Sequence, residues 1–162
     1  MKKFLTAVLV IQMVCPKAVQ TQTLRNYSYY NQKLPGDKPT IFAPGVISDG
    51  LANRDFAISP DGNEILYTIQ QRDLISVIMY THKIRGKWSL PQVAEFSGMY
   101  NDLEPAFAPD GNRLFFASNR PLTESDSISD YNIWYAERKN GNWSNPVPAG
   151  SKVNSEKDEY YP

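Results

Sequence analysis

The sequence predicts an all-β protein built from repeated antiparallel sheets, and three observations support that prediction. Strand formers and turn formers are both abundant, because the 162 residues include 10 Tyr and 7 Phe together with 12 Pro and 9 Gly. A stretch of apolar and turn residues occurs twice. A second, Trp-containing landmark follows each copy in the same order, so the repetition extends over a whole structural unit.

The first landmark is a Ser/Ala-Pro-Asp-Gly-Asn turn between two apolar runs. It lies within Arg54-Asp-Phe-Ala-Ile-Ser-Pro-Asp-Gly-Asn-Glu-Ile-Leu-Tyr-Thr68 and returns 49 residues later within Leu103-Glu-Pro-Ala-Phe-Ala-Pro-Asp-Gly-Asn-Arg-Leu-Phe-Phe-Ala117. The second landmark, Gly86-Lys-Trp-Ser-Leu-Pro91, returns 55 residues later as Gly141-Asn-Trp-Ser-Asn-Pro146. The longer second spacing reflects a polar insertion at 121–130, which is expected to be a loop. A repeat of about 50 residues made of short strands predicts the blades of a β-propeller.

Each copy of the turn has a residue suited to every position. Proline presets φ for the first central position of a type I turn, and aspartate suits the second. Glycine adopts a positive φ and forms the bulge that preserves the twist of the two strands. The predicted structural turn residues are Pro60, Asp61 and Gly62 in the first copy and Pro109, Asp110 and Gly111 in the second.

The strands expected around the turns make two four-stranded antiparallel blades. In the first copy they span 55–59, 64–70, 74–83 and 87–93, and in the second 104–108, 113–118, 132–138 and 143–147. Trp88 and Trp143 occupy equivalent positions in the two copies. We therefore expect both rings to pack on a blade surface or between blades rather than to stack on a ligand.

The chain divides into five segments on this basis: a signal peptide and N-terminal linker (1–22), a lead-in (23–50), two blades (51–97 and 98–150) and the start of a third (151–162). Asp158-Glu-Tyr-Tyr-Pro162 aligns with Asn101-Asp-Leu-Glu-Pro105. Because a propeller needs roughly 4–8 blades to close, we expect an incomplete propeller, truncated from a longer protein and prone to aggregate alone. The alternative is that a partner completes the edge strand.

The N-terminus has the pattern of an export signal. Lys2 and Lys3 precede a mostly apolar run from Phe4 to Cys15 that is too short to span a bilayer comfortably. No transmembrane segment is expected after the signal is removed. A lipid anchor at Cys15 is disfavoured because Val14 precedes it, where lipoprotein signals carry a small residue. Cys15 is the only cysteine, so no disulfide is expected in the mature chain.

The residues predict a non-enzymatic chain with no catalytic residue, metal ion or cofactor. His82 is the only histidine, which argues against a two-histidine metal site, and no nucleophile elbow or phosphate-binding loop occurs. Seventeen basic and 17 acidic residues give no basic excess that would indicate nucleic-acid binding. A solvated loop is favoured over a cation site for the carboxylates Glu124, Asp126 and Asp130.

One polar group remains as a candidate binding site. Asp55 and Glu104 are aligned just before the apolar residues of the first strand in each copy, near where an inner strand would line a propeller channel. Arg54 and Asp102 lie beside them in the sequence. We therefore predict that Arg54, Asp55, Asp102 and Glu104 form a polar channel mouth that binds a ligand.

The chain resembles the TolB-like β-propeller proteins, whose WD-type repeats carry Pro-Asp-Gly. The resemblance covers about residues 40–162 and rests on Phe56-Ala-Ile-Ser-Pro-Asp-Gly62, on Glu104-Pro-Ala-Phe-Ala-Pro-Asp-Gly-Asn112 with the following Leu-Phe-Phe-Ala-Ser-Asn-Arg120, and on the two Gly-x-Trp-Ser-x-Pro segments. It implies a six- or seven-bladed propeller of a bacterial periplasm or outer envelope, or a secreted one, that binds a protein or an envelope component. The motifs themselves identify the fold and not the ligand.

Two other functions are compatible with the same repeats. Similar propellers accompany the catalytic domain of prolyl-oligopeptidase-type peptidases, so the chain is alternatively the non-catalytic part of a larger hydrolase whose catalytic residues lie outside it. The second alternative is a carbohydrate-active propeller.

Overall fold

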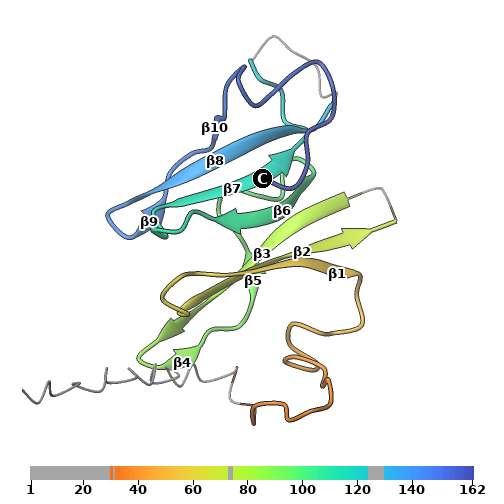
Figure 1. The fold of residues 1–162 in the computed structure, drawn as a ribbon, viewed down its shortest axis with the longest axis vertical. Helices are drawn as coiled ribbons and strands as arrows, with labels where there is room; N and C mark the ends of the chain where they lie inside the picture. Colours follow the sequence, from red (N-terminus) through yellow and green to blue (C-terminus); the bar gives the residue numbers. More distant parts are fainter. Residues whose placement is uncertain (1–29, 31, 73–74, 124–129) are drawn as a thin grey trace, which may run out of the picture.

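The computed structural model describes residues 30, 32–72, 75–123 and 130–162. These residues form no helix, and their strands make two antiparallel sheets (Figure 1). Within this part of the chain, no helix has the length and apolar character needed to cross a membrane. The predicted signal segment with Cys15, and the loop carboxylates Glu124 and Asp126, lie outside the described residues.

Each sheet is built from consecutive strands. The first contains β1 (Asn53–Ile58), β2 (Glu64–Gln71), β3 (Ile75–Ile84), β4 (Lys87–Trp88) and β5 (Gln92–Val93). The second contains β6 (Asp102–Phe107), β7 (Arg113–Ser118), β8 (Asn132–Lys139), β9 (Asn142–Trp143) and β10 (Val147–Pro148). The prediction of an all-β chain with antiparallel sheets is confirmed.

The prediction of one continuous fourth strand in each sheet is wrong. Trp88 pairs with Lys83 on β3, but Val93 pairs with Met79, so the outer strand contains one residue more than β3 between these pairs. The same offset separates β9 from β10 along β8. A proline, Pro91 in the first sheet, lies within the break, and its lack of an N–H prevents it from donating to a regular ladder. The outer strand is therefore split into two short pieces.

A serine compensates for this break in both sheets. The Oγ of Ser89 accepts a hydrogen bond from the N–H of His82 at 3.2 Å. In the second sheet the Oγ of Ser144 accepts from the N–H of Glu137 at 3.0 Å. The Trp-Ser-x-Pro landmark therefore encodes a bulge. The backbone N–H that loses its backbone partner at this bulge donates to the serine side chain instead.

The hairpin turn has the same geometry in both copies. Gly62 has φ +70° and donates its N–H to the Ser59 carbonyl at 2.8 Å, and Gly111 has φ +72° and donates to the Ala108 carbonyl at 2.9 Å. The side chain of Asp61 accepts a hydrogen bond from the N–H two residues further on, at 3.0 Å. A type I turn followed by a left-handed residue connects β1 to β2 and β6 to β7.

The two sheets pack face to face over one apolar core. Leu66, Ile78 and Ala94 from the first sheet and its following segment meet three buried residues of the second sheet, Leu114, Phe116 and Trp134. Burial of a side chain of this size stabilises the fold by about 1.5–3 kcal/mol. This core is the main contact that holds the two sheets together.

The sheets converge at one edge and diverge at the other. The first strand of the second sheet, β6, lies close to β1, β2 and β3 of the first sheet. The backbones of the outer strands β4, β5, β9 and β10 come close to no strand of the other sheet. The arrangement is therefore fan-shaped, with the first strands of both copies at the narrow edge.

The lead-in covers part of the opposite face of the first sheet (Figure 1). Ala43 and Ile47 are buried against Ile65 and Tyr67, and Trp88 packs against the same cluster. In the second sheet, Trp143 packs at the edge of the core between the sheets. Both tryptophans therefore lie at packing surfaces, as the sequence predicted.

We expect Gly111→Ala to lower the free energy of unfolding by about 1–2 kcal/mol, because an L residue is strained at this left-handed φ. The added Cβ would also lie 3.4 Å from the Cδ of Pro60. Gly36→Ala is the matched control, since a Cβ at Gly36 meets nothing within 4 Å. Urea denaturation of the two variants and the wild type measures the difference. Equal midpoints for both variants would contradict the turn assignment.

Candidate functional site

The first strand of each sheet, β1 or β6, contains a β-bulge at the edge where the sheets converge. In β1 the two bulged residues are Asp55 and Phe56, and in β6 they are Glu104 and Pro105. The first residue of each bulge has a left-handed φ, +55° for Asp55 and +59° for Glu104. A bulge also accommodates Pro105, because a residue at this position need not donate to the ladder.

The third copy of the repeat has the same backbone feature. Tyr161, which aligns with Glu104, has φ +55°. A left-handed conformation costs a non-glycine residue about 1–2 kcal/mol, so it persists only where surrounding contacts impose it. Asp55, Glu104 and Tyr161 are therefore equivalent strained positions in three successive copies.

Arg54 connects these three positions. Its Nε lies 2.7 Å from Oδ2 of Asp55, and its Nη2 donates to Oε1 of Glu104 at 3.1 Å and to the hydroxyl of Tyr161 at 3.2 Å. Its Nη1 donates to Oε1 of Gln70 at 2.9 Å. The second carboxylate oxygen of Glu104 accepts the N–H of Tyr161 at 2.7 Å. We call Arg54, Asp55, Glu104 and Tyr161 the mouth cluster.

The Glu104 carboxyl has an unusual environment. Its side chain is 4% exposed. Burial raises the pKa of Glu104, and the negative charge of Asp55 raises it further. The hydrogen bonds from Tyr161 and the positive charge of Arg54 lower the pKa, but burial prevails, so the net direction is upward.

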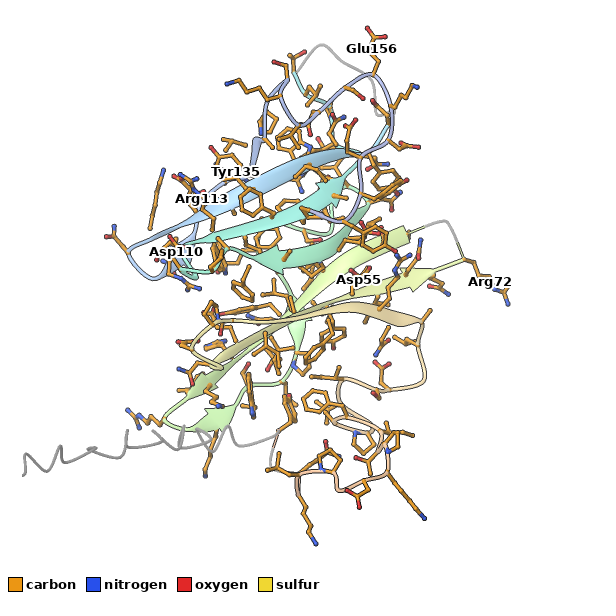
Figure 2. All side chains as sticks on the ribbon, viewed as in Figure 1. Asp55, Arg72, Asp110, Arg113, Tyr135 and Glu156 are labelled. Carbon is orange, nitrogen blue, oxygen red and sulfur yellow. The ribbon has the colours of Figure 1, made fainter. Side chains whose placement is uncertain are left out.

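A pocket of about 430 Å³ opens beside the mouth cluster. Its aromatic wall contains Tyr131 and Tyr160, whose ring centroids are 5.1 Å apart at an angle of 38°. Gln70 and Asn101 contribute amide groups, and Arg54 and Glu104 contribute charges. Figure 2 shows Asp55 near the junction of the two sheets, away from the turn that carries Asp110. The pocket therefore combines aromatic surface with a few polar groups, as ligand sites commonly do.

Of the four residues predicted for the mouth, the structure brings Arg54, Asp55 and Glu104 together and places Asp102 elsewhere. Asp102 is fully buried, with its Oδ1 2.6 Å from Nη2 of Arg120, and the Ser97 hydroxyl donates to its other oxygen at 2.8 Å. Asp102 therefore anchors the segment that enters β6 and does not line the pocket.

Aromatic rings surround the Arg120 guanidinium. Its central carbon lies 5.0 Å from the ring centroid of Phe116, 5.3 Å from Trp134 and 5.5 Å from Tyr100. Cation–π attraction and the ion pair with Asp102 both compensate for the desolvation of this charge. The arrangement ties the connection between the sheets to the apolar core.

Sequence reasoning missed five residues of the site: Gln70, Asn101, Tyr131, Tyr160 and Tyr161. Tyr161 had a detectable signal, because the alignment of the third copy places it at the position of Glu104. The other four had none, since they reach the pocket from the end of β2, the residue before β6, the residue before β8 and the C-terminal segment. Only the packing of the sheets makes them neighbours.

Within the described ranges, no group of three or more His, Cys, Asp and Glu residues is arranged to hold a metal ion. His82 stacks on Tyr80 with ring centroids 5.2 Å apart, far along β3 from the pocket lining. The mouth cluster therefore remains the candidate site.

Comparison with known proteins returned no matching family and no significantly similar curated protein.

We expect Asp102→Asn to destabilise the protein by about 3–5 kcal/mol, because it leaves the Arg120 charge buried without its partner. Chemical denaturation measures the change. Asp110→Asn is the matched control, since Asp110 is exposed in a turn and an asparagine keeps the oxygen that accepts the Asn112 N–H. A similar loss of stability in both variants would contradict the stabilising role of the buried Asp102–Arg120 ion pair.

The raised pKa of Glu104 predicts a pH-dependent contribution to stability. Between the ordinary value of about 4.3 and the raised value, the folded state holds a proton that the unfolded state releases. This contribution is therefore fully present below the ordinary pKa and is lost as the pH rises through the raised pKa.

Glu104→Gln should remove this component, so the wild-type stability minus that of the variant should decrease as the pH rises through that window. Urea denaturation at a series of pH values measures the difference. Glu137→Gln controls for the loss of one carboxylate, because Glu137 lies in a partly exposed pair with Arg113. A constant difference between wild type and Glu104→Gln would contradict the prediction.

Proposed function

We propose that the chain is an exported, TolB-like β-propeller module that binds a protein or a cell-envelope component and performs no catalysis itself. Each antiparallel sheet is one blade in this proposal. The observation that carries it is the convergence of three equivalent repeat positions, Asp55, Glu104 and Tyr161, on the side chain of Arg54.

This convergence supports rotation of the repeats about a common axis. If successive repeats were related by translation alone, the distance between their two inner strands would equal the distance between their two outer strands. Here the inner strands contact each other and the outer strands do not. Such a fan of sheets around a central axis is the arrangement of propeller blades.

The exposed apolar surface of the first sheet supports further blades. Its Ile65 and Tyr67 are equivalent to Leu114 and Phe116, which pack against the neighbouring sheet. The lead-in covers Ile65 and Tyr67 but leaves a hollow of about 620 Å³ beside Phe56, which is 45% exposed. A neighbouring blade would remove this apolar surface from water.

The chemistry of the mouth supports binding rather than catalysis. Arg54 pairs with both mouth carboxylates, Asp55 and Glu104, and the second oxygen of Glu104 accepts a backbone N–H. Both oxygens of Glu104 accept hydrogen bonds, and Asp55 contributes an ion pair, so these groups position Arg54 and Tyr161. Strained backbone at all three equivalent positions is a feature that clusters at binding sites.

A photo-crosslinking amino acid tests the proposal in living bacteria. Placed at position 161, whose native side chain is 74% exposed at the pocket, it should give a discrete crosslinked envelope partner. Placed at position 113, where the arginine side chain is 55% exposed away from the pocket, it should not. The same products at both positions, or none at position 161, would contradict a binding function of the mouth.

A further inference from the structure

We infer that the pocket at the mouth binds a neutral saccharide, held by tyrosine rings and side-chain amides. The inference deepens the proposed binding function and rests on it. It follows from four properties of the pocket: its charge balance, its aromatic wall, its amide groups and the state of the surrounding backbone.

The charged groups of the pocket compensate each other. Arg54 and Glu104 both line it, and Nη2 of the arginine lies 3.1 Å from the carboxylate. The Asp55 side chain contacts Nε of the same guanidinium, and Asp55 lines the apolar hollow instead of this pocket. An ionic ligand would have to compete with these internal ion pairs, whereas a neutral ligand leaves them intact.

The aromatic wall suits the apolar face of a sugar ring. Tyr131 and Tyr160 present tilted rings 5.1 Å apart, and Tyr161 adds a ring that is 74% exposed. A tyrosine offers an apolar face for C–H groups and a hydroxyl that exchanges hydrogen bonds. A sugar has the complementary combination of C–H faces and equatorial hydroxyls.

The amide groups of the pocket are oriented by bonds to their oxygens. Oε1 of Gln70 accepts from Arg54 at 2.9 Å, and Oδ1 of Asn101 accepts the N–H of Ser76 at 3.0 Å. These bonds assign the NH₂ groups as the donor ends of the two amides. The side chain of Asn101 also hydrogen-bonds the Tyr131 hydroxyl, which links this amide to the aromatic wall. Hydroxyl oxygens of a saccharide are suitable acceptors for them.

The backbone around the pocket argues against a peptide ligand. A peptide that adds a strand needs backbone N–H and C=O groups that are still available for pairing. Four N–H groups at the pocket already donate to side chains, namely those of Ser76, Glu104, Tyr131 and Tyr161. Recognition here therefore depends on side chains, and the volume of about 430 Å³ is within the range of small-molecule sites.

Saturation-transfer NMR with the full chain tests the inference, with glucose, galactose and N-acetylglucosamine as probes. We expect saturation transfer to at least one of these sugars. Tyr160→Ala should weaken its binding by about tenfold, the loss expected for one stacked ring. Tyr161→Ala is a second variant at a more exposed position, where the fold depends less on the side chain.

Tyr135→Ala is the matched control, because this tyrosine packs on Phe115 outside the pocket lining. Sugar binding that survives the control and falls in both pocket variants supports the inference. The absence of transfer to all three sugars at millimolar concentration overturns it, as does binding that neither pocket variant weakens. If the sugars fail while the crosslinker at position 161 still captures a partner, the saccharide is excluded and the proposed binding function stands.

Discussion

The apolar contact between the two sheets holds the fold together. Leu66 and Ile78 of the first sheet and Phe116 and Trp134 of the second exclude water from the space between the sheets. Because the backbone of β6 lies close to β1, β2 and β3, this packing places the bulges of β1 and β6 at the same edge. The polar mouth exists only as a consequence of that apolar packing.

In the mouth cluster, a strained backbone conformation and a buried charge occur in the same residue, Glu104. Glu104 has a left-handed backbone and a buried carboxylate, and each feature alone would destabilise the fold. Arg54 and the N–H of Tyr161 compensate by occupying both carboxylate oxygens. The same contacts hold the C-terminal segment against the first sheet. Tyr161 of the third repeat copy is therefore positioned by Glu104, the equivalent residue of the second copy.

Asp102 and Glu104 are separated by one residue, yet their carboxylates have different roles. The reason is that the β-bulge of β6 begins at Glu104, after the regular pairing of Asp102 and Leu103. Side chains two residues apart in a regular strand share one face of the sheet. Asp102 lies in the regular part of β6 and pairs with Arg120 in the core, whereas Glu104 begins the bulge and reaches Arg54 at the mouth. The positive φ at Glu104 interrupts the alternation that a simple strand pattern assumes.

The all-β class, the turns at Gly62 and Gly111, and the approximate positions of the three longer strands in each sheet could be predicted from the amino-acid sequence alone. These features depend on residues close in the chain, whose backbone preferences and alternation act locally. Three features depend on contacts between distant residues: the split of the outer strand, the separation of Asp102 from the mouth, and the meeting of Arg54 with Glu104 and Tyr161. Arg54 is 50 and 107 residues away from those two partners, so only the packing of the sheets brings them together.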